Sequence, residues 1–249
     1  MQPEYLNNLS ENVARLVLHT EEWAGIEITV VLDPKRAFGN PDEPEPMACE
    51  IDEHGARLLI GNPAYFPDAS VFHELQHIRR ILLEGVPRIV VCEGFEPWSP
   101  QLDTAMTQLD NNLEHLIIVP RELEVYPARR AHWEDRVQRM LNRLAGKEFP
   151  NVDRVRFAML AWILVHHMTP RQELQDAAGL ILRELRIEDR AGQYRDAVTV
   201  ALASKEQLVR ITFEYFALPA NAGCLEYLDA HNRTTSVVAL TDVLAPAQT

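Results

Sequence analysis

The chain has 249 residues, of which 47% are hydrophobic and 24% are charged, and its formal net charge is -13. These proportions are close to those of soluble globular proteins and exclude a disordered chain. Because an acidic field repels a polyanion, we expect no broad nucleic-acid binding, and a partner of basic character is favoured.

The first part of the chain predicts a helix, a strand and a hairpin. Apolar residues recur at a helical spacing over residues 4–22. Residues 26–32, IEITVVL, are rich in β-branched side chains, which favours a strand. Two further strand-like runs, 47–51 and 56–60, flank a turn in which we expect Gly55 to take the positive φ of a hairpin loop. A short β-sheet should therefore lie near the N-terminus.

Two amphipathic helices follow this sheet in the sequence. Asp68 is a suitable N-cap and Gly85 a suitable residue just after a C-terminus, so a helix is expected over 69–84. A short strand is expected at 88–92. The next apolar pattern is again helical, and Pro120 should close that helix because proline disfavours the helical conformation of the residue before it.

The rest of the chain is mainly helical by the same criterion, and its final stretch has no clear period. Further helices are expected at 128–145, 152–168, 170–186 and 190–209. The predicted fold class is therefore α+β. A compact domain of a short β-sheet and helices over residues 1–120 is followed by a mainly helical extension over residues 121–249.

The cysteines and the N-terminus bear on the cellular compartment. Cys49, Cys92 and Cys224 are odd in number and far apart, which predicts unpaired thiols in a reducing compartment rather than a disulfide framework or a CxxC metal site. The N-terminal residues lack the basic start and apolar stretch of a secretory signal, and no apolar run is long enough to span a bilayer. We therefore expect a cytoplasmic protein without a membrane segment.

The stretch SVFHELQHIRRILLEG, residues 70–85, carries a metal-binding pattern. His73 and His77 are one helical turn apart and project from one face, so both imidazoles can bind one Zn²⁺ ion. Glu74 lies about 100° around the helix from His73, where it can act on water as a general base rather than bind the metal. The apolar residues fall on the opposite side and predict a core-facing surface.

A catalytic zinc needs a third protein ligand and leaves one position to water. The stretch QLDNNLEHLIIVP on the next helix offers three candidates. Asp110 and Glu114 share one face of that helix, whereas His115 lies on another. We prefer Glu114 as the ligand and Asp110 as its outer partner. His115 and Asp110 remain the alternatives, because the helix angle alone does not choose among them.

The HELQH motif resembles the HExxH of zincin metallopeptidases, and a glutamate on a following helix is the gluzincin arrangement. Within that group, the strand ARLLIGNP before the motif and the helix ending in LIIVP after it look like the small ImmA/IrrE-like proteases. The similarity covers roughly residues 26–120 and is specific only at HELQH. The sequence departs from the family at Gln76, where a glycine is usual, and at the segment DNNLEH.

These observations predict a zinc metallopeptidase that acts on a peptide or protein substrate. In the mechanism that the resemblance implies, His73, His77 and Glu114 hold Zn²⁺ and Glu74 is the general base. One alternative keeps the zinc in a non-proteolytic regulatory module. Another is a helical interaction protein without a metal. In the hydrolase, the helical region could gate the cleft, recognise a protein partner or build a homo-oligomer.

Overall fold

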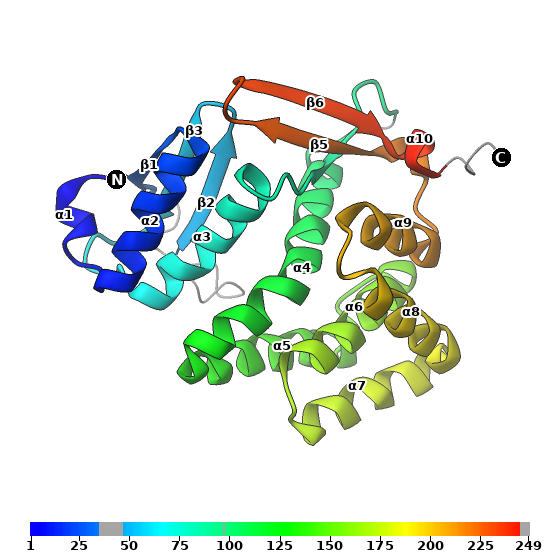
Figure 1. Ribbon diagram of the computed structural model, residues 1–249. Coiled ribbons are helices and arrows are strands. Elements are labelled where there is room, and N and C mark those ends of the chain that lie inside the picture. Colours follow the sequence, from blue (N-terminus) through cyan, green and yellow to red (C-terminus); the bar gives the residue numbers. More distant parts are fainter. Residues whose placement is uncertain (35–46, 97, 245–249) are drawn as a thin grey trace. The chain divides into compact units, whose positions relative to one another are not determined.

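The computed structural model describes residues 1–34, 47–96 and 98–244 and has the predicted α+β class (Figure 1). The chain divides into two compact units. The first unit comprises Met1–Arg88 and Leu225–Val238, and the second comprises Ile89–Cys224 and continues from Ala239. The sequence places a boundary after residue 120, whereas the structure divides the chain after Arg88 and returns to the first unit near the C-terminus.

The sheet of the first unit has three strands in the order β1-β3-β2. Strand β1 (Glu27–Leu32) pairs in parallel with β3 (Gly55–Ile60), and β2 (Met47–Asp52) pairs antiparallel with β3. The strand predicted from a β-branched run and the hairpin predicted from two strand-like runs around a turn are therefore confirmed. Leu58 in the central strand has no exposed surface, as expected for a strand whose apolar side chains enter the core.

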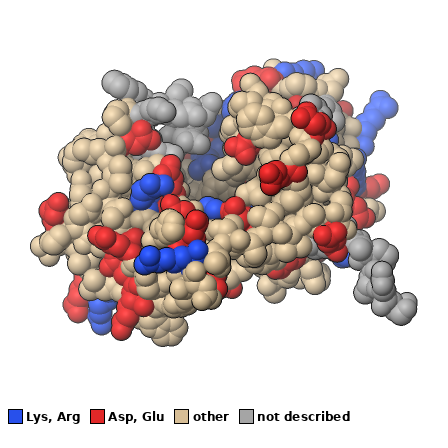
Figure 2. All heavy atoms as spheres, turned by 90° about the horizontal axis from the view of Figure 1, so that it is seen from above, with Lys and Arg blue, Asp and Glu red and all other residues tan. Residues whose placement is uncertain are grey.

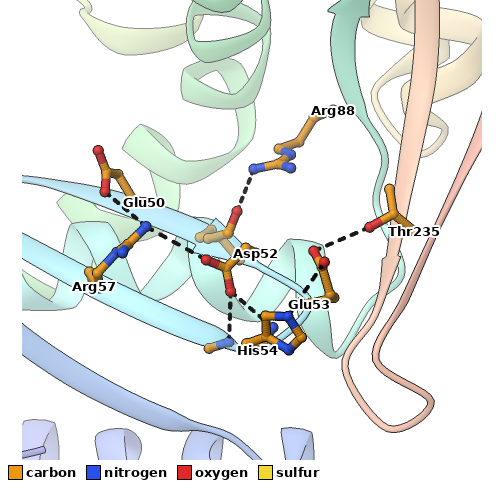
Figure 3. Close-up of polar contacts among 9 residues, drawn as sticks. Glu50, Asp52, Glu53, His54, Arg57, Arg88 and Thr235 are labelled. Atoms are coloured by element: carbon orange, nitrogen blue, oxygen red, sulfur yellow. Dashed lines mark hydrogen bonds and ion pairs between the residues drawn. The ribbon is translucent and has the colours of Figure 1, made fainter.

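The β2–β3 turn is stabilised by a side chain rather than by a left-handed glycine. The Asp52 Oδ1 atom accepts hydrogen bonds from the backbone N–H groups of His54 at 2.9 Å and Gly55 at 3.0 Å (Figure 3). The prediction of a positive φ at Gly55 was wrong, because its φ lies outside the left-handed region. A Cβ atom there would lie 3.0 Å from the carbonyl oxygen of Glu27, so the close approach of β1 favours glycine.

Three helices complete the main segment of the first unit: α1 (Pro3–Leu6), α2 (Glu11–Ala24) and α3 (Asp68–Leu82). Helices α2 and α3 pack against each other and on the sheet (Figure 1). The single helix expected over residues 4–22 is thus divided into two. Asp68 is not an N-cap as predicted but lies in the first turn of α3, where its Oδ1 accepts a hydrogen bond from the backbone N–H of Ser10 at 3.0 Å. This bond ties the starts of the two helices together.

The second unit is a helical assembly around α6, which contacts α4, α5, α7 and α8. Its helices are α4 (Pro100–Val125), α5 (Arg130–Ala145), α6 (Asn151–Met168), α7 (Gln172–Leu185), α8 (Glu188–Ala201), α9 (Lys205–Phe216) and α10 (Leu240–Leu244), with single turns at Pro127–Arg129 and Ala220–Ala222.

Two predicted helix boundaries in this unit were wrong. Pro120 does not close its helix, because α4 continues to Val125. Proline costs the helix one internal hydrogen bond, but the buried side chains of Glu122 and Leu123 anchor the turn that follows. The single helix predicted over 190–209 is two helices, α8 and α9. Ser204 begins the second by accepting a hydrogen bond on its side chain from the backbone N–H of Gln207 at 3.3 Å.

Strands β4 (Arg88–Val91), β5 (Gly223–Asp229) and β6 (Thr234–Ala239) form a second sheet in the order β4-β5-β6. The strand predicted at 88–92 is confirmed, and the two later strands lie in the stretch that had no clear period. Cys92 and Cys224, which follows the first residue of β5, form a disulfide with a Cα–Cα distance of 5.2 Å. The prediction of three unpaired thiols was therefore wrong, because the fold brings together cysteines 132 residues apart.

The surface carries charges of both signs. On the face drawn in Figure 2, Lys and Arg side chains lie singly or in small groups among the acidic ones. Within the described part of the chain, no helix combines the length and the apolar character needed to cross a bilayer. The absence of broad nucleic-acid binding stays a prediction.

We expect the Cys92–Cys224 disulfide to stabilise the fold. Reduction should lower the free energy of unfolding by about 2–5 kcal/mol, because the bridge restricts a long loop in the unfolded chain. Urea unfolding with and without reductant measures this change. A variant with both cysteines replaced by serine is the control, since reductant should leave its unfolding midpoint unchanged. An equal midpoint for the oxidised and reduced wild-type protein would contradict the prediction.

Candidate metal centre

The two motif histidines lie side by side on α3, as their spacing predicts. The ring centroids of His73 and His77 are 5.1 Å apart, and the rings are inclined at 73°. Only 4% of His73 and 8% of His77 is exposed. A buried imidazole needs a partner for its ring nitrogens, so this pair is more than the solvated face of a surface helix.

Helix α3 is buried on its polar side as well as on its apolar side. Val71, Leu75 and Ile78 are fully buried and form the predicted core-facing surface. Glu74 and Arg80 are also buried, with 6% and 5% of their surfaces exposed. Burying charged side chains is costly unless each one has a partner. The polar side of α3 is therefore built into the structure with specific contacts.

The thiol of Cys49 on strand β2 is affected by the charge of Glu74, because β2 packs against α3. Burial, and after it the negative charge of Glu74, raise the pKa of the Cys49 thiol well above its ordinary value. The thiol therefore stays protonated at neutral pH. Sequence reasoning missed this proximity, because nothing in the order of residues places β2 beside this turn of α3.

Two of the candidate third ligands on α4 are held by a lysine. The Nζ atom of Lys205 lies 2.8 Å from Asp110 Oδ1 and 2.7 Å from Glu114 Oε1. Asp110 Oδ1 also accepts a hydrogen bond from the backbone N–H of Ile89 at 3.0 Å. Burial alone would lower the pKa of Lys205, but the two carboxylates outweigh it and raise that pKa. Lys205 is therefore charged, and it neutralises one of the two carboxylates.

The third candidate on α4, His115, lies in an aromatic and ionic environment. Its ring packs on the edge of Trp133 from α5, with centroids 5.1 Å apart. The Trp133 indole N–H donates to Glu122 Oε2 at 3.0 Å, and Arg129 Nε donates to Glu122 Oε1 at 2.8 Å. Glu122 has no exposed surface, so this network is a fixed part of the second unit. It restricts the orientation of the His115 ring.

The residues that sequence reasoning missed are those that hold the candidates in place. Lys205 is 91 residues from Glu114 in the sequence, and an isolated lysine at the start of a helix carries no signal of a buried role. The sequence around Trp133 and Glu122 is likewise typical of ordinary helix positions and gives no signal of their role. The preferred ligand, Glu114, stays a prediction, and its hydrogen bond to Lys205 occupies one carboxylate oxygen. Among the described residues, His115 rather than Glu114 belongs with His73 and His77 to a group of donors that could hold a metal ion.

Comparisons with protein-family models, with curated proteins and with solved structures found no match to this chain. The resemblance to zincin metallopeptidases therefore depends on the HELQH motif and its surroundings alone.

We expect Lys205 to be essential to the stability of the second unit. Lys205→Met would remove the buried cation that Asp110 and Glu114 share, which should lower the free energy of unfolding by about 3–5 kcal/mol. Lys147→Met is the matched control. Lys147 also pairs with a glutamate, Glu184, but 67% of its side chain is exposed. The control should cost no more than about 1 kcal/mol. Equal effects of the two substitutions in urea unfolding would contradict the role assigned to Lys205.

Proposed function

We propose that this protein is a zinc-dependent hydrolase in which His73, His77 and His115 hold the ion and Glu74 is the general base. One observation carries the proposal. Among the residues that the structure describes, these three buried histidines make up a group of donors that could hold a metal ion. The order of preference for the third ligand thus changes from Glu114 to His115.

The donor set suits zinc in a catalytic role. Neutral imidazole nitrogens are common zinc ligands, and three of them leave a fourth position free for water. A purely structural zinc is usually closed by a fourth protein ligand. The one free cysteine, Cys49, would be an obvious fourth ligand, but it is not a member of the histidine group. The donor set therefore favours an open site.

Zinc bound there would lower the pKa of a coordinated water and polarise a substrate carbonyl. The protein residues have separate tasks. His73 and His77 bind from adjacent turns of one helix, and His115 is oriented by its contact with Trp133. Glu74 accepts the proton of the attacking water and returns it to the leaving amine. The resemblance of HELQH to zincin metallopeptidases supports an amide bond in a peptide or protein as the substrate.

A non-catalytic zinc module is the second candidate, and one observation favours it. His73, His77 and His115 each expose 8% or less of their surface, which suits a stabilising ion. A cytoplasmic location also stays a prediction. The Cys92–Cys224 disulfide counts against it, because such bonds are rare in reducing compartments.

Zinc affinity should show whether His115 or Glu114 is the third ligand. We expect His115→Ala to weaken zinc binding by more than about 100-fold, since losing a ligand costs more than losing an outer partner. Glu114→Gln should retain stoichiometric zinc. Chelator competition followed by elemental analysis measures both affinities. His73→Ala is the positive control for loss of a ligand. Loss of zinc in Glu114→Gln with retention in His115→Ala would restore Glu114 as the third ligand.

An assay of hydrolysis should distinguish the role of Glu74 as a base from the role of the histidines as zinc ligands. Glu74→Gln keeps the size of the side chain but removes the base, so we expect full zinc occupancy and a loss of activity of about 100-fold or more. The assay uses the zinc-loaded full chain and a library of quenched fluorescent peptides. A wild-type protein that binds zinc stoichiometrically yet cleaves no peptide would favour the non-catalytic module.

A further inference from the structure

Most edges of the two sheets are covered by side chains. On the edge strand β1, the Gln2 amide donates to the Val30 carbonyl oxygen at 3.1 Å and accepts from the Val30 N–H at 2.8 Å, so it takes the place of a neighbouring strand. On β2, the Ile51 carbonyl oxygen accepts from Arg88 Nη1 at 2.7 Å. On β4, the Ile89 N–H donates to a carboxylate of α4 at 3.0 Å. Such cover keeps an edge strand from pairing with another chain.

Strand β6 is the edge that stays exposed. It ends the second sheet, beside β5. Its sequence, TTSVVA, contains neither a charged residue nor a proline, and its first five residues are all exposed. Val237 and Val238 point to opposite faces of the strand, and 55% and 36% of their surfaces are exposed. Charges, prolines and covering groups are what normally protect an edge strand, so β6 is open to pairing with a further strand.

Polar contacts hold the β5–β6 hairpin in place. The Nε atom of Arg88 donates to Glu226 of β5 at 3.0 Å, and a second nitrogen of the same guanidinium contacts the same oxygen. The Thr235 hydroxyl of β6 donates to Glu53 at 3.4 Å (Figure 3). Because β6 is already an extended strand, pairing with a partner would order little additional backbone.

We propose that β6 pairs in antiparallel orientation with β6 of a second copy of this chain, so that two three-stranded sheets join into one. A two-fold axis at the centre of the strand sets Ser236 opposite Val237 of the second copy, and no like charges meet along the strand. Antiparallel pairing also brings Arg233, just before β6, toward Asp242, which lies just after β6 in the second copy. Both side chains are exposed, and the symmetry makes this attraction twice. Parallel pairing would instead bring like charges together.

This assembly closes on itself. Each copy has one β6, and a two-fold contact uses the same strand on both sides, so the product is a dimer and not a filament. A pair of six-residue strands forms a small interface, at the weak end of specific protein contacts. We therefore expect a reversible dimer with a dissociation constant on the order of 10 µM or weaker.

Sedimentation of the full chain over roughly 1 µM to 1 mM measures the dimer. Val237→Lys places two lysines beside the two-fold axis, so we expect it to weaken the dimer by about tenfold or more. Val200→Lys is the matched control, because Val200 is an exposed valine of α8, with 84% of its surface exposed, and its replacement should leave the dimer unchanged. Thermal unfolding of both variants verifies that they fold.

A mixture of charge variants tests whether the partner is a second β6. Val237→Glu alone should dimerise as poorly as Val237→Lys, whereas an equimolar mixture of the two should form a one-to-one heterodimer, because opposite charges then meet at the axis. Hydrogen exchange of the amides of residues 234–239 in the wild-type protein should slow as its concentration rises. A wild-type protein that is monomeric at every concentration overturns the proposal. A dimer that Val237→Lys does not weaken, or a mixture of the charge variants that stays monomeric, also overturns it.

Discussion

Burial of charge is the constraint on which the candidate site depends. An ionised carboxylate or ammonium group loses its hydration when it is buried, and only close partners of opposite charge compensate for the loss. Lys205 meets this requirement for Asp110 and Glu114 through two contacts shorter than 3 Å. These contacts join α9 to the middle of α4. The same lysine holds one oxygen of Glu114 at 2.7 Å, so the position of this carboxylate depends on the docking of α9.

Helix α3 is under the same constraint in the first unit. Its apolar face packs as any amphipathic helix does, but its polar face is also shielded from water. Strand β2 packs against α3 and carries the Cys49 thiol, whose pKa is raised by burial and further by the charge of Glu74. Because β2 and β3 form a hairpin, the position of this thiol is set by the pairing of the strands, in which Cys49 lies opposite Leu58. The environment of Glu74 thus depends on the register of the sheet.

Local patterns in the sequence predicted the helices and strands. Contacts between residues that are distant in the sequence changed some of their boundaries. A β-branched run identified β1, two strand-like runs around a turn identified β2 and β3, and the histidine spacing identified the face of α3, because these signals arise within a few residues. Pro120 was misjudged because burial of the following turn outweighs the lost hydrogen bond. Lys205, Trp133 and the Cys92–Cys224 pair could not be predicted, since each acquires its role only from a partner more than ten residues away. The third ligand was uncertain in the sequence for the same reason.

The cost of burying charge is also visible at Asp110. The pKa of its carboxyl group is raised, chiefly by burial and further by the charge of Glu114, against the opposing effect of Lys205. Lys205 thus compensates for part of the cost of burying two carboxylates on α4, and the remainder falls on the protonation of Asp110.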